Sequence, residues 1–172
     1  MYLARAIHFD ESDRNVFHCP ARTGEWCISG GFEFSNWGDG DLVGKARQAF
    51  ANGWLGLETF GRVTFVAVTR IEQAEYDALV QSLAAHFVQV YGAPNLEAAL
   101  PVAAEELVQM SELCADHNPN TVLTVLRELT DAGVREQYRF LEPSDAGLEQ
   151  FAIHGSLDDD DHVHGPGCGH DH

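Results

Sequence analysis

Lysine is almost missing from this sequence: Lys45 is the only one in 172 residues, and Lys and Arg together number 10 against 27 Asp and Glu. The formal net charge of −17 argues against binding to nucleic acids or to anionic membranes, because both need a basic face. No run of about 18 apolar residues occurs, which argues against a transmembrane helix. The opening residues MYLARAIHFDESD contain no long apolar stretch of the kind found in secretory signals, so we expect a cytoplasmic protein.

Several catalytic and metal-binding motifs are missing as well. No CxxC pair occurs, which argues against a zinc ribbon or a thioredoxin-type site, and the four cysteines are too widely spaced to indicate a disulfide framework. The phosphate-loop pattern, the GxSxG turn of serine hydrolases and the HExxH helix of zinc proteases are also absent. The body of the chain therefore gives no positive sign of catalysis or of a cofactor, and we favour a protein that is not an enzyme.

Hydrophobic periodicity predicts the strands and helices. Gly30-Gly31 falls inside one predicted strand and indicates a bulge or a close approach of the backbone. Strands are expected over residues 2–9, 15–19, 24–34, 54–59 and 62–70, and a hairpin over 120–129 and 134–141 that turns at Gly133. Helices are expected over residues 42–51 (capped by Asp41), 72–91 and 95–116, where Pro101 should separate a short helix from a longer one.

This order of elements predicts an α+β fold. We expect a two-layer sandwich in which two to three helices cover one face of a mainly antiparallel sheet. Residues 1–153 should form the single folded domain, because periodicity fades after residue 143. Residues 154–172 are polar and rich in Asp and Gly, and we expect them to form a disordered tail.

The tail contains the most legible chemistry of the chain. After four consecutive aspartates come five side chains that can bind a metal within eleven residues: His162, His164, Cys168, His170 and His172. Imidazole nitrogen and thiolate suit borderline and soft cations, and the intervening glycines allow a short chain to wrap an ion. Nickel or zinc is the expected metal. A ligand set without an enforced geometry should bind reversibly, which suits trafficking better than catalysis.

Two stretches of the chain resemble known proteins. The tail resembles the His-rich, Cys-containing endings of bacterial metal-handling proteins, notably the nickel-linked prolyl isomerase chaperones, through the five metal-binding side chains named above. The body is similar to an uncharacterised bacterial family of unknown function, through RAIHFDESDRNVF (5–17), GEWCISGGFEF (24–34) and QAFANGWLGLETFGRVTFVAV (48–68). This family implies no activity or site residues that can be transferred.

Other candidate clusters have simpler structural explanations. Cys19 and Cys27, with the nearby histidines at 8 and 18, could form a second metal site or a Cys–His pair, but neighbouring strand residues point to opposite faces. Cys114 and His117 have a CxxH spacing, but packing and helix capping account for both. The tryptophans and nearby phenylalanines could line a groove, yet such residues more often form the core.

Two functional hypotheses follow from the sequence. The first is a cytoplasmic accessory protein whose tail binds or passes a transition metal ion, with a metalloenzyme, another protein or a second copy of the chain as partner. The alternative is a small ligand-binding domain or enzyme with a dispensable tail. The alternative predicts a concave pocket in the body that is lined by aromatic residues and contains at least one titratable group with a shifted pKa.

Overall fold

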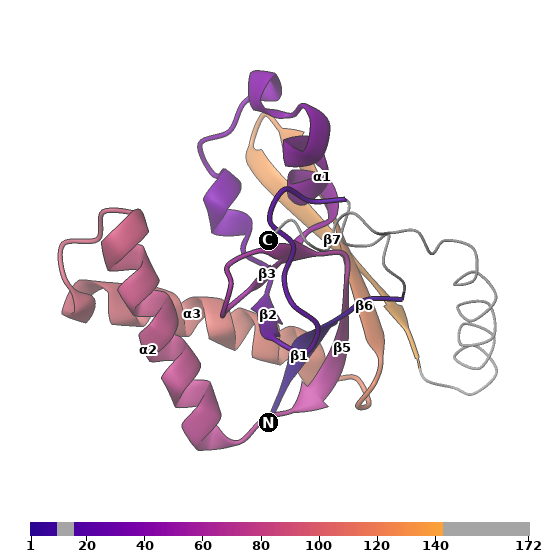
Figure 1. The fold of residues 1–172 in the computed structure, drawn as a ribbon, viewed down its shortest axis with the longest axis vertical. Helices are drawn as coiled ribbons and strands as arrows, with labels where there is room; N and C mark the ends of the chain where they lie inside the picture. The colour runs from indigo at the N-terminus through magenta and orange to yellow at the C-terminus, as the bar shows by residue number, and fades with distance from the viewer. Residues whose placement is uncertain (10–15, 143–172) are drawn as a thin grey trace.

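The computed structural model describes residues 1–9 and 16–142. That part of the chain forms one sheet and three α-helices (Figure 1). The elements are, in chain order, β1 (Tyr2–Ile7), β2 (Trp26–Ile28), the 3-10 helices η2 (Gly31–Phe34) and η3 (Asp39–Asp41), α1 (Gly44–Asn52), β3 (Trp54–Gly56), β4 (Arg62–Val63), β5 (Phe65–Arg70), α2 (Gln73–Val90), α3 (Leu96–Ala115), β6 (Val122–Thr130) and β7 (Gly133–Leu141).

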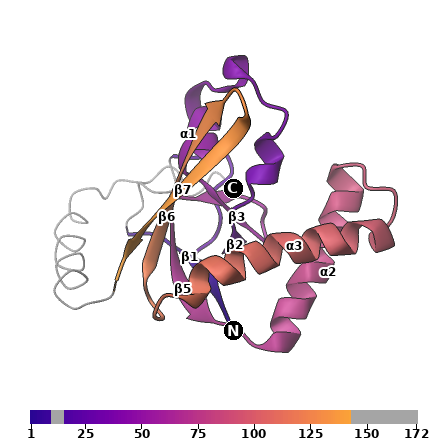
Figure 2. The ribbon, with the colours of Figure 1, turned by 180° about the vertical axis from the view of Figure 1, so that it is seen from behind.

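The sheet has seven strands in the order β4-β3-β2-β1-β5-β6-β7, and every neighbouring pair is antiparallel. The sheet curls, so that the long β6–β7 hairpin rises beside α1 (Figures 1 and 2). Leu3, Val66, Val68 and Leu123 are fully buried in its centre. The predicted α+β fold with a mainly antiparallel sheet is confirmed, and so is the hairpin, in which Gly133 has a φ of 117°.

The two long helices form an antiparallel pair. In both ribbon views, the turn that joins α2 to α3 lies away from the sheet, while α3 packs against β1 and β2 (Figures 1 and 2). The buried side of α3 carries Ala103, Leu107, Met110 and Cys114, at spacings of three and four residues. The predicted break at Pro101 is wrong: α3 is continuous, because a proline near the start of a helix removes only one early hydrogen bond.

Four predicted strands differ markedly from the observed ones. The stretch 62–70 is two strands, β4 at the edge of the sheet and β5 inside it. The two residues of β4 are both buried, whereas β5 alternates, with Val66 and Val68 buried. The stretch 24–34 is a strand only over Trp26–Ile28, since Gly30 has a φ of 71° and the 3-10 helix η2 follows. Residues 16–19 are not a strand, and β3 is shorter than the predicted 54–59.

The start of α1 also differs from the prediction. The helix begins at Gly44 after Val43, without a side-chain cap. Asp41 does not cap it, because its carboxylate accepts a hydrogen bond from the backbone N–H of Gly38 at 2.8 Å instead. Asp41 thus closes the short helix η3 rather than opening the longer one.

A buried carboxylate holds the loop between β3 and β4. Glu25 is only 5% exposed. Its Oε1 accepts the backbone N–H groups of Glu58 and Thr59, both at 2.8 Å, and its Oε2 accepts the N–H of Arg22 at 2.6 Å and the Thr59 hydroxyl at 2.8 Å. Glu25 therefore ties the turn before β2 to the loop after β3.

None of the helices in the described part of the chain is long and apolar enough to cross a membrane. The predicted domain boundary at residue 153 and the predicted tail lie outside the described residues. Both stay predictions.

Candidate functional site

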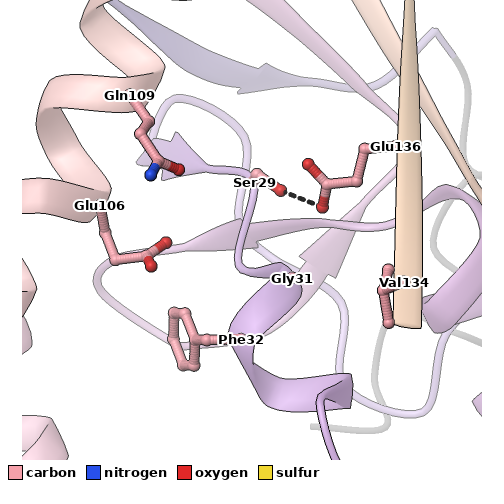
Figure 3. A pocket seen from close by; sticks show the side chains of 7 residues that line it. All are labelled: Ser29, Gly31, Phe32, Glu106, Gln109, Val134 and Glu136. Atoms are coloured by element: carbon pink, nitrogen blue, oxygen red, sulfur yellow. Dashed lines mark hydrogen bonds between the residues drawn. The ribbon is translucent and has the colours of Figure 1, made fainter. Parts of the chain in front are cut away.

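A cavity of about 380 Å³ opens between α3, η2 and β7, and we call it the α3–β7 pocket. Figure 3 shows side chains extending from α3 on one side and from β7 on the other, with the turn that follows β2 between them. The lining residues are Ser29, Gly31, Phe32, Glu106, Gln109, Val134 and Glu136. The volume is within the range of small-molecule sites.

A buried arginine forms the wall behind this pocket. Arg127, on β6, is 2% exposed. Its Nε donates to Glu136 Oε2 at 2.8 Å, its Nη1 donates to the carbonyls of Phe50 and Gly53 at 2.9 and 2.8 Å, and its Nη2 donates to the carbonyl of Ser29 at 2.5 Å. Arg127 thereby connects the end of α1, the turn after β2 and the hairpin, and it fixes the two of these that line the pocket, the turn at Ser29 and β7 at Glu136.

A second buried arginine stabilises the same turn. Arg62 donates to the carbonyls of Gly53 and Gly30, each at 3.0 Å, and forms an ion pair with Glu33. The guanidinium carbons of Arg62 and Arg127 lie 4.6 and 5.2 Å from the centroid of the Phe34 ring. Burial, and then the charge of Arg127, lower the pKa of Arg62 to about 10, so Arg62 stays charged at neutral pH.

Glu136 is saturated with donors. Besides Arg127, the Ser29 hydroxyl donates to its Oε2 at 2.7 Å and the Tyr138 hydroxyl donates to its Oε1. Burial by itself raises the pKa of this carboxyl, but Arg127 and the hydrogen bonds from Ser29 and Tyr138 outweigh that effect, so the pKa of Glu136 lies below its ordinary value. Glu136 is therefore a fixed negative charge on the β7 side of the pocket.

Glu106 has the opposite surroundings. It lies next to the buried stripe of α3, between Ala103 and Leu107, and projects towards the cavity (Figure 3). Within the described part of the chain, no hydrogen bond or ion pair reaches its carboxylate. Burial, followed by the charges of Glu136 and Glu105, raises the pKa of Glu106.

The close approach predicted at Gly30-Gly31 is confirmed. A Cβ on Gly31 would overlap the carboxylate of Glu136, and a Cβ on Gly30 would overlap the side chain of Leu55. Gly30 also has a positive φ, which disfavours other residues. The two glycines therefore allow the turn after β2 to reach the base of the pocket.

Two further cavities offer less chemistry. One, of about 400 Å³, includes Arg5, Trp26 and Glu75, but these groups already bind one another: Arg5 lies 3.9 Å from the centroid of the Trp26 ring, and the Trp26 indole donates to Glu75 at 2.9 Å. The other, of about 200 Å³, is lined by aromatic rings and alanines together with Cys19, His18 and Lys45, and its one carboxylate, Glu33, is paired with Arg62. The α3–β7 pocket alone among these three contains a carboxylate without a donor, so it is the candidate site.

The metal-binding side chains predicted from the sequence, His162, His164, Cys168, His170 and His172, all lie outside the described residues. Within residues 1–9 and 16–142, no group of three His, Cys, Asp or Glu side chains is placed to hold a metal ion. The predicted nickel or zinc site in the tail stays a prediction.

The body cysteines differ from one another. Cys27 and Cys114 are fully buried, as the packing explanation predicts, and burial raises the pKa of both thiols, that of Cys114 to about 12. Cys19 is exposed, so it is not a core residue. His117 lies 3.4 Å from Glu142 and stacks on Phe140, which gives it a structural setting near the end of α3.

Sequence reasoning missed the pocket residues. One indication was present: Arg127 alternates with Leu123 and Val125 on the inward side of β6, where a charge needs a buried partner. Its partner, Glu136, stands directly opposite in the hairpin register. Glu106 gives no such sign, because a glutamate beside a helical stripe is usually exposed to solvent.

Comparison with known proteins identifies a family and no function. A family model described as a family of unknown function, DUF6505, matches residues 1–159. No curated protein and no solved structure matches the chain. The resemblance of the body to a family of unknown function is thus confirmed, and its role has to be inferred from its own residues.

Proposed function

Starting from a chain that belongs to DUF6505, a family of unknown function, we propose that its folded body is a small-molecule-binding domain whose site is the α3–β7 pocket. The observation that carries the proposal is a pair of carboxylates, Glu106 and Glu136, which face one cavity and whose pKa values are shifted in opposite directions. Such pairs concentrate at functional sites, because a structural carboxylate normally has donors.

The hydrogen bonds favour binding over catalysis. Ser29 donates its hydroxyl proton to Glu136 and also lies 3.2 Å from Arg127 Nη2, so it has no free base beside it. Both oxygens of Glu136 accept hydrogen bonds from the protein. A nucleophile needs a base that can take its proton, and a general base needs a free lone pair aimed at the substrate. The pocket instead offers a rigid wall and one free carboxylate.

A screen with a blocked pocket tests this function. Gln109 lies at the rim on the exposed side of α3, so Gln109→Trp should fill the pocket without disturbing the core. Ligand-observed NMR with a library of small polar compounds should find compounds that bind the natural chain and not this variant. Val108→Trp is the matched control, because Val108 is 41% exposed on the same helix and does not line the pocket. Equal binding by both variants would contradict the proposal.

The tail favours a second, independent function. We propose that it binds nickel or zinc reversibly, so that the protein acts as an accessory factor for a metalloenzyme or another partner. The supporting observation is the density of donors, five in the last eleven residues, behind four consecutive aspartates. The body would contact the partner and the tail would hold or pass the ion.

Replacing the donors in the full chain tests the tail. A variant with His162, His164, His170 and His172 changed to Ser, together with Cys168→Ser, should lose the binding of Ni²⁺ and Zn²⁺ that calorimetric titration detects in the natural chain. The matched control replaces Asp158, Asp159, Asp160 and Asp161 by Asn, which lowers local charge and keeps every nitrogen and sulfur donor. Unchanged metal uptake by the Ser variant would remove the tail from this function.

A further inference from the structure

The chemistry of the α3–β7 pocket specifies a class of ligand. We infer that the pocket binds a small organic cation, a primary amine in its ammonium form, with the ammonium group on Glu106 and the apolar part of the molecule against Phe32. This inference rests on the proposed binding function and names the ligand class of that same site.

Charge is the first reason for a cation. The charged side chains at the pocket are Glu106 and Glu136, with Glu105 nearby on the same helix. Arg127 balances Glu136 and cannot turn towards a ligand, because its three nitrogens already donate to Glu136, to Ser29 and to backbone carbonyls. Among the residues that the structure describes, one carboxylate, that of Glu106, therefore has no counter-charge. An anionic ligand would meet two carboxylates there and no available cation among these residues.

Hydrogen-bonding capacity is the second reason. The Ser29 hydroxyl donates its proton to Glu136, so it is not a donor for a ligand, and the carboxylate of Glu106 is an acceptor that no described residue fills. Gln109 donates an amide N–H to Glu105 at 3.5 Å, and its amide oxygen is a further acceptor. The lining thus offers acceptors, and an ammonium group supplies three N–H donors without an acceptor of its own. Neutral alcohols supply one donor and leave the remaining acceptors unpaired.

The aromatic wall is the third reason. Phe32 lines the pocket and is held from behind by edge contacts with Phe87 and Tyr91, at ring-centroid distances of 5.1 and 5.6 Å. A fixed ring beside an unpaired carboxylate suits a ligand with both an apolar group and a positive charge, since the face of the ring attracts cations.

Binding should be coupled to the ionisation of Glu106. Burial, and then the charges of Glu136 on β7 and Glu105 on α3, raise the pKa of Glu106, while Arg127 behind Glu136 is paired with that carboxylate. An ammonium group stabilises the carboxylate form, so at a pH where Glu106 still holds its proton, binding sends that proton to the solvent and the ligand keeps its own three. The affinity should therefore rise with pH through the titration of Glu106, until the amine itself loses its proton.

The test uses three probes of one shape and different charge: benzylamine, benzyl alcohol and benzoate, with n-butylamine and tetramethylammonium as further cations. Calorimetric titration of the full chain should show benzylamine binding at least about tenfold more tightly than the other two benzyl compounds. Titration at a series of pH values should show the affinity for benzylamine rising with pH through the titration of Glu106.

Glu106→Gln is the deciding variant, since it keeps the size of the side chain and removes its charge. It should weaken benzylamine binding about tenfold or more and abolish the rise of affinity with pH that Glu106 causes. Glu105→Gln is the matched control: Glu105 is exposed on the same helix and does not line the pocket, so its affinity should change less than about twofold. Thermal unfolding checks that both variants are folded.

The outcomes separate the two proposals. Two results would overturn the inference of a cationic ligand and leave the proposed binding function in place. One is that benzyl alcohol or benzoate binds the pocket as tightly as benzylamine does. The other is that benzylamine still binds the Glu106→Gln variant with the natural affinity. The inference of a cationic ligand would also be overturned if no cation bound while the library screen found a neutral or anionic ligand of the pocket. Absence of any pocket ligand in both experiments would overturn both proposals.

Discussion

Two carboxylates that folding withdraws from water have opposite surroundings in this protein. Glu25, before β2, accepts three backbone N–H groups and a hydroxyl, whereas Glu106, on α3, accepts no hydrogen bond from the residues that the structure describes. A carboxylate whose lone pairs are filled by the backbone holds chain segments together. A carboxylate that faces a cavity and has no hydrogen-bond donor lowers stability, and it is available to accept hydrogen bonds from a ligand. The first is structural, and the second is the centre of the proposed site.

Glu136 combines features of both. It lines the pocket together with Glu106, but its oxygens are occupied, as those of Glu25 are. Its position shows that lining a cavity is not by itself a sign of ligand binding. What distinguishes Glu106 is the missing donor, and three measurements test this distinction.

The largest effect is expected from Arg127→Met, which removes the cation of Glu136. The variant leaves a buried carboxylate and several carbonyls without their donor, so the free energy of unfolding should fall by about 4 kcal/mol. Urea denaturation measures it. The matched control is Arg135→Met on the same hairpin, whose ion pair with Glu128 is exposed and should contribute less than about 1 kcal/mol. Similar losses in the two variants would show that the buried network is not structural.

A smaller loss is expected from Glu25→Ala. Three backbone N–H groups and the Thr59 hydroxyl lose their acceptor, and the free energy of unfolding should fall by about 3 kcal/mol. Glu58→Ala is the control, because Glu58 lies in the same loop, is exposed and pairs only with Arg22 at the surface. Chemical denaturation of both variants gives the difference. If Glu25→Ala lost no more stability than Glu58→Ala, Glu25 would not be the clamp of this loop.

The smallest expected effect is on how stability depends on pH, which should differ in sign between Glu106 and Glu136. Because the pKa of Glu106 is raised, ionised Glu106 lowers the free energy of unfolding at a pH above that pKa. Glu106→Gln should therefore stabilise the protein near neutral pH, by less than about 1 kcal/mol. This gain should vanish as the pH falls below the ordinary carboxyl value. The lowered pKa of Glu136 has the opposite sign: its stabilisation is present above the ordinary value and is lost as the pH falls through the lowered one.

Denaturation curves of both glutamine variants across this pH range make the check. Glu136→Gln should be less stable than the natural chain at neutral pH and approach it in acid. The same sign of change at neutral pH for both variants would contradict the assignment of one carboxylate to the fold and the other to the ligand.

Local patterns were sufficient for the regular elements. The β6–β7 hairpin follows from alternation on both sides of a glycine that adopts a positive φ, and α2 follows from its apolar stripe. The division of 62–70 into β4 and β5 could not be predicted, because no Gly, Pro, Asn or Asp marks a turn between them, while β4 pairs with β3 and β5 pairs with the distant β1. The early end of β2 depends on the carbonyls of Ser29 and Gly30 reaching two distant arginines.

The sequence by itself determined the α+β class, the acidity and the density of His and Cys side chains in the tail, because these depend on composition and on short-range periodicity. Only the tertiary structure decided that Glu136 would be neutralised by Arg127 while Glu106, thirty residues earlier, would face the same cavity alone. The physical reason is that the ionisation and partners of a carboxylate are set by the groups that folding places around it. The two glutamates are chemically identical in the sequence, and they differ only in the surroundings that folding gives them.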